Sequence, residues 1–196
     1  MSDTSSISRA RRAALAGGCT FRAVRHGGDL SYRFECPNHR SKLRVLDELA
    51  TIDACDPWVA SRARAIAADA LGDRLQTLLA AHRYVRDGVE FIEEPCETFQ
   101  AARLTLSSQV GDCDCSALAL AALLRSLGYV VRFGTLASPP THVAVQVLWE
   151  GRWEWLETTM KAEPGEHPLA ARERLGADDR PDLRGPAGLA KARARR

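Results

Sequence analysis

The chain lacks an apolar run long enough to cross a lipid bilayer, and its first residues lack the apolar segment of a secretory signal. Met1 to Arg12 is instead rich in serine and arginine. These two absences favour a soluble, cytoplasmic protein with no membrane partner. Because the cytoplasm keeps thiols reduced, we expect the six cysteines to be thiols rather than a disulfide framework.

A large net charge is also missing. The sequence has a formal charge of +2, which gives no reason to expect a specific nucleic-acid partner. The charge is uneven, because residues 171–196 hold eight lysine or arginine residues and only four acids. Solvated, frayed chain ends commonly have this composition, so residues 166–196 are expected to form a basic, disordered tail.

The remaining composition predicts one packed domain with extensions. Hydrophobic residues make up 45% of the 196 residues, which is enough for a core, and the sequence has no internal repeat. We interpret residues 1–17 as a flexible arm and 18–56 as an accessory hairpin and linker. The main domain is expected to span 57–165.

Local patterns place the first elements. Polar and apolar residues alternate over Leu30–Cys36, which predicts a strand paired with Phe21–Arg25. Asp56-Pro57 is a typical helix start, and that helix is expected to end near Gly72. A second helix is expected to follow, capped by Asp73. Beyond it we expect a short extended piece at 89–92 and a loop at 93–110.

A strongly apolar helix is predicted from Cys113 to about Ser126. Asp112 is a suitable N-cap, and Gly128 stands where a left-handed stop is needed. Helices and strands together make an α+β fold. The three expected strands are Tyr129–Ala137, His142–Trp149 and Arg152–Thr158.

Three residues in this half have the chemistry of a cysteine nucleophile and its partners. Cys113 lies at the start of a helix, where the helix dipole and unpaired N–H groups favour a thiolate. His142 and Glu157 follow on strands, in the order nucleophile, base and orienting acid. Asp112 or Asp114 is the alternative acid.

Whether Glu157 can reach the histidine depends on the hairpin turn between their strands. If Glu150-Gly151 forms a two-residue turn, Ala144 lies opposite Glu157 and His142 is its diagonal neighbour on the same face. A slip of one residue would move Glu157 to the opposite face of the sheet. The orienting role of Glu157 therefore depends on this register.

Taken together, three segments resemble the transglutaminase-like (papain-like cysteine) superfamily, in its short bacterial and phage type. The first reads Gly-x-Cys-x-x-x-Ala and continues into a helix over Gly111–Tyr129. The second is the His-Val-x-Val-x-Val of His142–Val147, and the third is the Trp-x-x-Leu-acid-x-Thr of Trp153–Thr159. The resemblance covers residues 58–160.

The resemblance implies a papain/transglutaminase-like core, with a nucleophile helix packed on a small antiparallel sheet. It assigns the catalytic cysteine, histidine and acid to Cys113, His142 and Glu157. Glu157 stands where the family usually has Asp, and Cys115 stands where it usually has a second Asp. Side chains two residues apart on a helix point in directions that differ by about 200°. Cys115 is therefore expected to pack inward, away from the histidine.

The expected activity is cysteine-dependent acyl transfer on protein or peptide amides, by hydrolysis or by transfer to an amine. His142 would take the thiol proton of Cys113, and backbone N–H groups of the helix start would hold the oxyanion. The upstream block, from Tyr84–Asp87 to Thr98–Gln100, also resembles the segment ahead of the nucleophile in short bacterial and phage members. It suggests Gln100 as a further oxyanion donor, and Gln109 is closer in sequence to Cys113. No cofactor and no metal are expected, and the oligomeric state is left open.

Two other classes remain open. One is a catalytically inactive binding or assembly module on the same fold, such as a phage accessory protein. The other is a zinc-binding domain, because Cys36 and His39 have the spacing of a ligand pair that Cys19 and Cys55 could complete.

Overall fold

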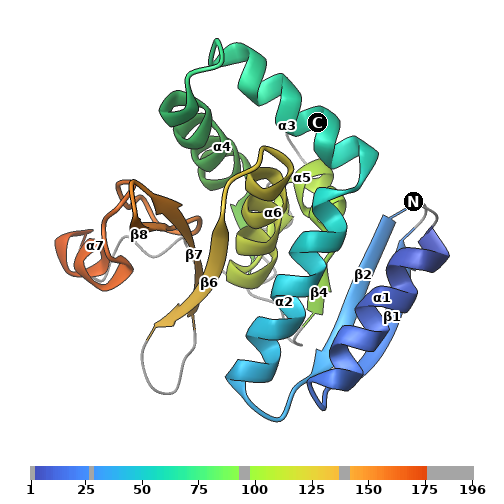
Figure 1. Cartoon of the computed structure of the whole chain (residues 1–196). Helices are drawn as coiled ribbons and strands as arrows, with labels where there is room; N and C mark the ends of the chain where they lie inside the picture. The colour runs from blue at the N-terminus through green and yellow to red at the C-terminus, as the bar shows by residue number, and fades with distance from the viewer. Residues whose placement is uncertain (1–2, 27–28, 93–97, 137–141, 176–196) are drawn as a thin grey trace, which may run out of the picture.

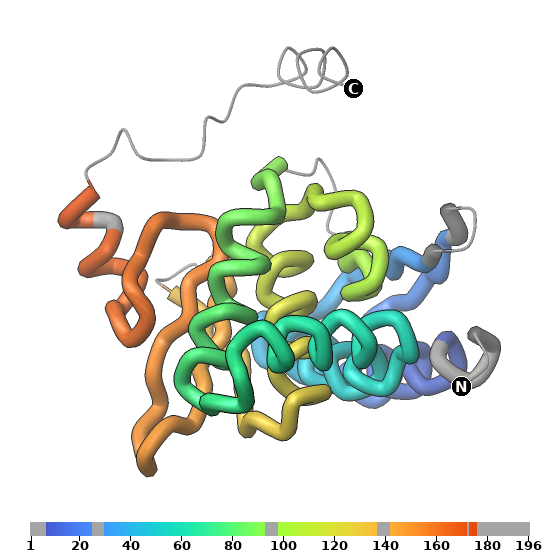
Figure 2. The backbone as a smooth tube through the Cα atoms, turned by 90° about the horizontal axis from the view of Figure 1, so that it is seen from above, coloured from blue at the N-terminus to red at the C-terminus, as the bar shows by residue number. Residues whose placement is uncertain are grey.

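The computed structural model describes residues 3–26, 29–92, 98–136 and 142–175. It is a mixed α+β structure built around one helix, α6, that lies near the middle of the molecule in both views (Figures 1 and 2). A three-stranded sheet lies on one side of α6 and the N-terminal hairpin on the other. In the described part of the chain, no helix is both long enough and apolar enough to cross a membrane.

Helix α6 spans Cys113–Ser126, as the sequence predicted. The Asp112 side chain accepts a hydrogen bond from the Cys115 N–H at 2.9 Å and caps the helix start. Gly128 has a φ of 80°, the left-handed conformation that ends many helices. Every residue from Asp114 to Leu124 is buried, so the whole helix serves as core.

Four helices surround α6: α2 (His39–Ala54), α3 (Pro57–Asp69), α4 (Arg74–Gly88) and α5 (Ala102–Ser108). The predicted caps of α3 and α4 are confirmed, since Asp56 accepts from the Trp58 and Val59 N–H groups and Asp73 accepts from that of Gln76. Helix α5 lies within the segment where the sequence predicted a loop.

The position of α5 explains why local sequence did not reveal it. Its N-cap, Ala101, has no side-chain hydrogen bond to offer. The cap comes from another helix instead: the Ala102 N–H donates to Asp53 Oδ2 of α2 at 2.7 Å. Burial is the main cause that raises the pKa of Asp53, to about 7, and the nearby Asp56 adds to the shift.

The main sheet has the antiparallel order β6–β7–β8, with strands Val131–Leu136, His142–Trp149 and Arg152–Leu156. Trp149 pairs with Arg152, and Val145 pairs with Leu156, so the predicted register is confirmed. Glu150 and Gly151 both have positive φ, as a tight hairpin turn requires.

The two faces of this sheet are covered by different parts of the chain. Val143, Val145 and Val147 of β7 join α6 in the hydrophobic core. On the other face, Trp155 makes an edge contact with His167, near α7 (Pro168–Leu175). A Cβ atom added at Gly134 of β6 would lie 2.5 Å from the Trp155 ring, so only glycine allows the ring to lie against the strand.

The N-terminal part differs from a flexible arm followed by a linker. Helix α1 spans Asp3–Ala16, and its Ala10 and Ala14 are fully buried. Strands β1 (Thr20–His26) and β2 (Asp29–Glu35) form the predicted hairpin, and β4 (Thr98–Gln100) extends it to the order β1–β2–β4. One hydrophobic core includes residues from α1 to β8, so the accessory segment and the main domain share it. A short parallel pair, β3 (Glu90–Phe91) with β5 (Val110–Gly111), completes the fold.

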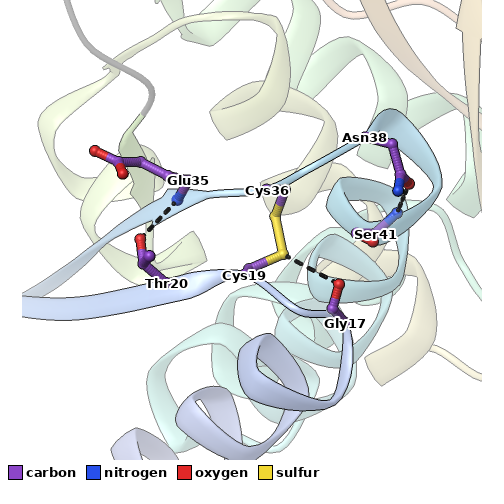
Figure 3. The surroundings of a disulfide bond; sticks show 7 residues. All are labelled: Gly17, Cys19, Thr20, Glu35, Cys36, Asn38 and Ser41. Atoms are coloured by element: carbon purple, nitrogen blue, oxygen red, sulfur yellow. Dashed lines mark hydrogen bonds between the residues drawn. A yellow bond between two sulfur atoms is a disulfide. The ribbon is translucent and has the colours of Figure 1, made fainter.

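The expectation that all six cysteines are thiols is wrong for two of them. Cys19 and Cys36 form a disulfide that closes the base of the hairpin (Figure 3). The register explains the pairing, because Thr20 lies opposite Glu35 and the next facing position outward is Cys19 against Cys36. The disulfide also uses two sulfurs that the zinc alternative required, and the described residues contain no group of three potential metal ligands. Cys19 and Cys36 are therefore not available as the zinc ligands that this alternative needs.

Candidate active site

Cys113 is the first residue of α6 and is partly buried. Its sulfur lies 3.9 Å from Asp114 Oδ1, to which the thiol donates a hydrogen bond. The backbone N–H of Val143 lies near the same sulfur and favours its thiolate form. Val143 directly follows His142 in β7, so the start of α6 meets the start of the strand that carries the predicted base.

The electrostatic surroundings of Cys113 differ from the expectation of a thiolate favoured by the helix start. Burial is the largest cause that raises the pKa of the thiol, and the carboxylates of Asp114 and Asp112 raise it further. The Val143 N–H and the Lys42 ammonium act in the opposite direction but do not cancel these effects. The resting sulfur is therefore a protonated thiol, because the residues that cap the helix also bring negative charge.

One carboxylate links this thiol to a lysine of α2. Asp114 is only 3% exposed, and its Oδ2 atom lies 2.6 Å from Lys42 Nζ. The Lys42 ammonium also lies 5.6 Å from the centre of the Phe99 ring. Lys42 thus compensates the negative charge that the sequence places beside Cys113.

The predicted contact between His142 and Glu157 is present. His142 Nε2 lies 2.6 Å from Glu157 Oε2, which is the contact expected from the hairpin register. When Nε2 carries the proton that Glu157 accepts, the Nδ1 atom of the same ring has a lone pair. Nδ1 is therefore the atom of His142 that can act as a base.

Glu157 is held on several sides. Its side chain has no exposed surface, and Oε1 accepts hydrogen bonds from the Thr159 N–H at 2.7 Å and the Thr159 hydroxyl at 2.9 Å. Burial by itself raises the pKa of Glu157, but His142 and the two Thr159 donors outweigh it and leave the pKa below its usual value. Glu157 is therefore an ionised, oriented partner for His142.

A residue that the sequence did not single out, His82 of α4, holds the backbone of Glu157. His82 Nε2 donates to the Glu157 carbonyl oxygen at 2.5 Å, and the ring is fully buried. Burial is the main cause that lowers the pKa of His82, so the ring is neutral. Its Nδ1 has no hydrogen-bond partner in the described part of the chain. In the sequence, His82 looked like one more position on the buried face of a helix, and no local signal linked it to Glu157.

The sequence also made predictions for Cys115, Gln100 and Gln109. Cys115 is fully buried, as predicted; its thiol donates to the Thr98 carbonyl at 3.4 Å and accepts from the Gln100 N–H at 3.3 Å. The Gln100 side-chain oxygen accepts from the Thr105 hydroxyl at 3.4 Å. These contacts place Gln100 beside Cys115, and its role as an oxyanion donor stays a prediction. Gln109 is the left-handed C-cap residue of α5.

No protein-family model matches the chain, and no curated protein sequence matches it. A crystal structure of a candidate cysteine protease from Cytophaga hutchinsonii aligns with 26% identity and a TM-score of 0.38, over 42% of this chain and 30% of that one. A candidate protease from Parabacteroides distasonis aligns with 14% identity and a TM-score of 0.50, over 74% of this chain and 36% of that one. This chain thus spans 30% and 36% of the lengths of the two structures. The α+β fold of this chain is thus similar to part of the Parabacteroides distasonis structure.

Proposed function

We propose that this protein catalyses cysteine-dependent acyl transfer on protein or peptide amides, with Cys113 as nucleophile, His142 as base and Glu157 as orienting acid. The observation that supports this proposal most is the 2.6 Å contact between His142 and a buried, ionised Glu157, next to the strand residue whose N–H lies near the Cys113 sulfur. Nucleophilic catalysis by a thiol needs a carboxylate that orients an imidazole, and an imidazole that can reach the thiol.

The first step is removal of the thiol proton. Because the pKa of Cys113 is raised, the resting enzyme does not hold a preformed thiolate. His142 Nδ1 accepts the proton as the sulfur attacks, and Glu157 stabilises the imidazolium that forms. General-base catalysis by His142 is therefore essential in this mechanism.

The acyl group then moves through a covalent intermediate. The Cys113 sulfur forms a bond to the carbonyl carbon, and the carbon–nitrogen bond breaks as His142 returns the proton to the departing amine. The thioester that remains reacts with water, which gives hydrolysis, or with a lysine amine, which gives transamidation. The similarity to a structure described as a candidate protease favours hydrolysis.

The oxyanion of the tetrahedral intermediate needs donors near the start of α6. The backbone N–H of Cys113 has no carbonyl partner within its helix, because it lies in the first turn. We assign it as one donor and the side chain of Gln100 as the second. In the transglutaminase-like superfamily that the sequence resembles, the upstream block supplies a donor of this kind.

A second candidate function is that of an inactive binding or assembly module on the same fold. The observation that favours it is the raised pKa of Cys113, since burial and, to a smaller extent, two acidic neighbours oppose the thiolate. Glu157 in place of the family's usual Asp, and Cys115 in place of its second Asp, point in the same direction.

Labelled peptides incubated with and without a primary amine separate these functions. Wild-type protein should release amine from a peptide amide, and Cys113→Ala should release none. Incorporation of the added amine would assign transamidation, and its absence would assign hydrolysis. If Cys113→Ala and wild type behave identically across a varied peptide library, the proposed activity is wrong.

A further inference from the structure

An arginine-lined cleft lies between α1, α2 and β6, apart from the candidate active site. It has a volume of about 730 Å³. Five arginines line it: Arg9, Arg12, Arg40, Arg44 and Arg132. We call this feature the arginine cleft.

The carboxylates of the arginine cleft do not neutralise it. Asp47 forms an ion pair with Arg125, and Glu48 lies 3.6 Å from Arg9. Within the described residues, the exposed Arg12, Arg40 and Arg44 have no carboxylate within ion-pair distance. The two acids are thus each bound by an arginine already, and three guanidinium groups remain to bind an anionic partner.

One of the five arginines is held in a fixed orientation. The Arg132 guanidinium lies 4.1 Å from the centre of the Trp153 ring, and its Nε donates to Gln146 Oε1 at 2.7 Å. Arg132 is therefore bound by β7 and β8 on the outer face of the sheet, and the charges left for a ligand in the cleft are those of Arg12, Arg40 and Arg44.

The lining between the charges is apolar and lacks an exposed aromatic ring. Ala13, Leu43 and Phe133 contribute apolar surface, and Phe133 is only 8% exposed. Single-stranded nucleic acids are usually bound through bases stacked on exposed aromatic rings. The described lining has no such ring, because its one aromatic residue, Phe133, is buried. Apolar patches between guanidinium groups suit a peptide whose aliphatic side chains alternate with carboxylates.

We propose that the arginine cleft binds an extended, acidic peptide segment of a protein partner. This interaction goes beyond the acyl-transfer activity and requires no reaction at Cys113. The carboxylates of the segment pair with Arg12, Arg40 and Arg44, and its small aliphatic side chains lie on the apolar lining. Charge complementarity of this kind accelerates association and selects the partner.

The test measures fluorescence anisotropy of a labelled peptide in which glutamate alternates with alanine and leucine. The Arg40→Gln/Arg44→Gln double variant should weaken binding about tenfold, because two charge pairs are lost. The matched control is Arg64→Gln/Arg83→Gln, which removes two exposed arginines from α3 and α4 and should bind like wild type. Should the first double variant not fold, Arg12→Gln on α1 tests the same cleft.

Two further probes decide whether the partner class is right. A peptide with lysine in place of glutamate should not bind. A single-stranded oligonucleotide should bind more weakly than the acidic peptide at the same salt concentration. The proposal is wrong if the acidic peptide does not bind wild type, if the two double variants lose affinity equally, or if the oligonucleotide binds more tightly through Arg40 and Arg44.

Discussion

Glu157 Oε2 lies 2.6 Å from His142 Nε2. Glu157 is the residue just beyond β8, and it reaches His142 diagonally across the hairpin that turns at Glu150-Gly151. Backbone register, rather than proximity in sequence, creates this contact. The same register turns Val143 toward α6, where its N–H meets the Cys113 sulfur. β7 therefore carries the predicted base directly before the residue whose N–H lies near the predicted nucleophile.

The Glu157 carboxylate should be required for activity. Glu157→Gln preserves the size of the side chain but removes the charge that stabilises the imidazolium, so kcat is expected to fall at least about a hundredfold. Glu157→Asp keeps the charge with a shorter reach and should retain more activity than Glu157→Gln. Steady-state kinetics on the best peptide substrate would measure both. Equal kcat for wild type and Glu157→Gln would remove Glu157 from the mechanism.

Asp114 and Lys42 should shift the pKa of Cys113 in opposite directions. Asp114→Asn removes a negative charge beside the thiol and should lower its pKa, whereas Lys42→Met leaves that charge uncompensated and should raise it. The rate of Cys113 alkylation against pH reports both shifts, read at each cysteine by mass spectrometry. Shifts in the same direction would indicate general disruption rather than electrostatics.

His82 should position Glu157 without taking part in the reaction. His82→Leu leaves the buried Glu157 carbonyl without its donor and should reduce the free energy of unfolding by about 1–3 kcal/mol. His82→Gln offers an N–H donor and should recover part of that loss together with part of kcat. Denaturant unfolding and kinetics of both variants test this. If Leu and Gln give the same stability and the same kcat, the hydrogen bond has no positioning role.

Asp53 should make the protein less stable as pH rises. Its pKa is raised from 3.8 to about 7 in the folded state, so the folded protein binds an extra proton between these values and loses the associated stability as pH rises through about 7. Asp53→Asn removes the buried charge and can still accept from the Ala102 N–H. At pH 8 the free energy of unfolding of the variant should exceed that of wild type by roughly 2–4 kcal/mol. At pH 5, where Asp53 is protonated in the folded protein, this advantage should be smaller. Thermal unfolding of both proteins from pH 5 to pH 8 measures this. A stability difference that does not change with pH would show that ionisation of Asp53 does not destabilise the fold.

Signals confined to a few neighbouring residues could be predicted from the sequence. The caps of α3, α4 and α6 depend on Asp56, Asp73 and Asp112, each next to the helix it caps, and all three are confirmed. The β7–β8 register followed from a two-residue turn in the same way.

Features that depend on distant partners were not predicted. Helix α5 is capped by Asp53, a residue from another helix, and no nearby side chain marks its start. The disulfide was not predicted, because Cys19 lies outside the predicted strand Phe21–Arg25, and only the register of the paired strands brings it opposite Cys36. The contact of His82 with Glu157 joins residues 75 positions apart.

The electrostatics of Cys113 show a conflict between two rules that apply to the same turn. A helix start favours a thiolate, and it also favours acidic residues as caps. Here Asp112 caps the helix and Asp114 lies in its first turn, so their charges, together with burial, oppose ionisation of the sulfur between them. The helix dipole and the acidic cap therefore act on the same sulfur in opposite directions.

The most direct test of the account is the alkylation rate of Cys113 as a function of pH in wild type and in His142→Ala, with iodoacetamide as reagent. The account predicts that Cys113 reacts faster at neutral pH in wild type than in His142→Ala, because His142 accepts the proton of the thiol as the sulfur attacks the reagent. If Cys113 reacts equally slowly in both proteins across the pH range, the sulfur and the ring do not act together, and the chain is a binding module on a protease-like fold.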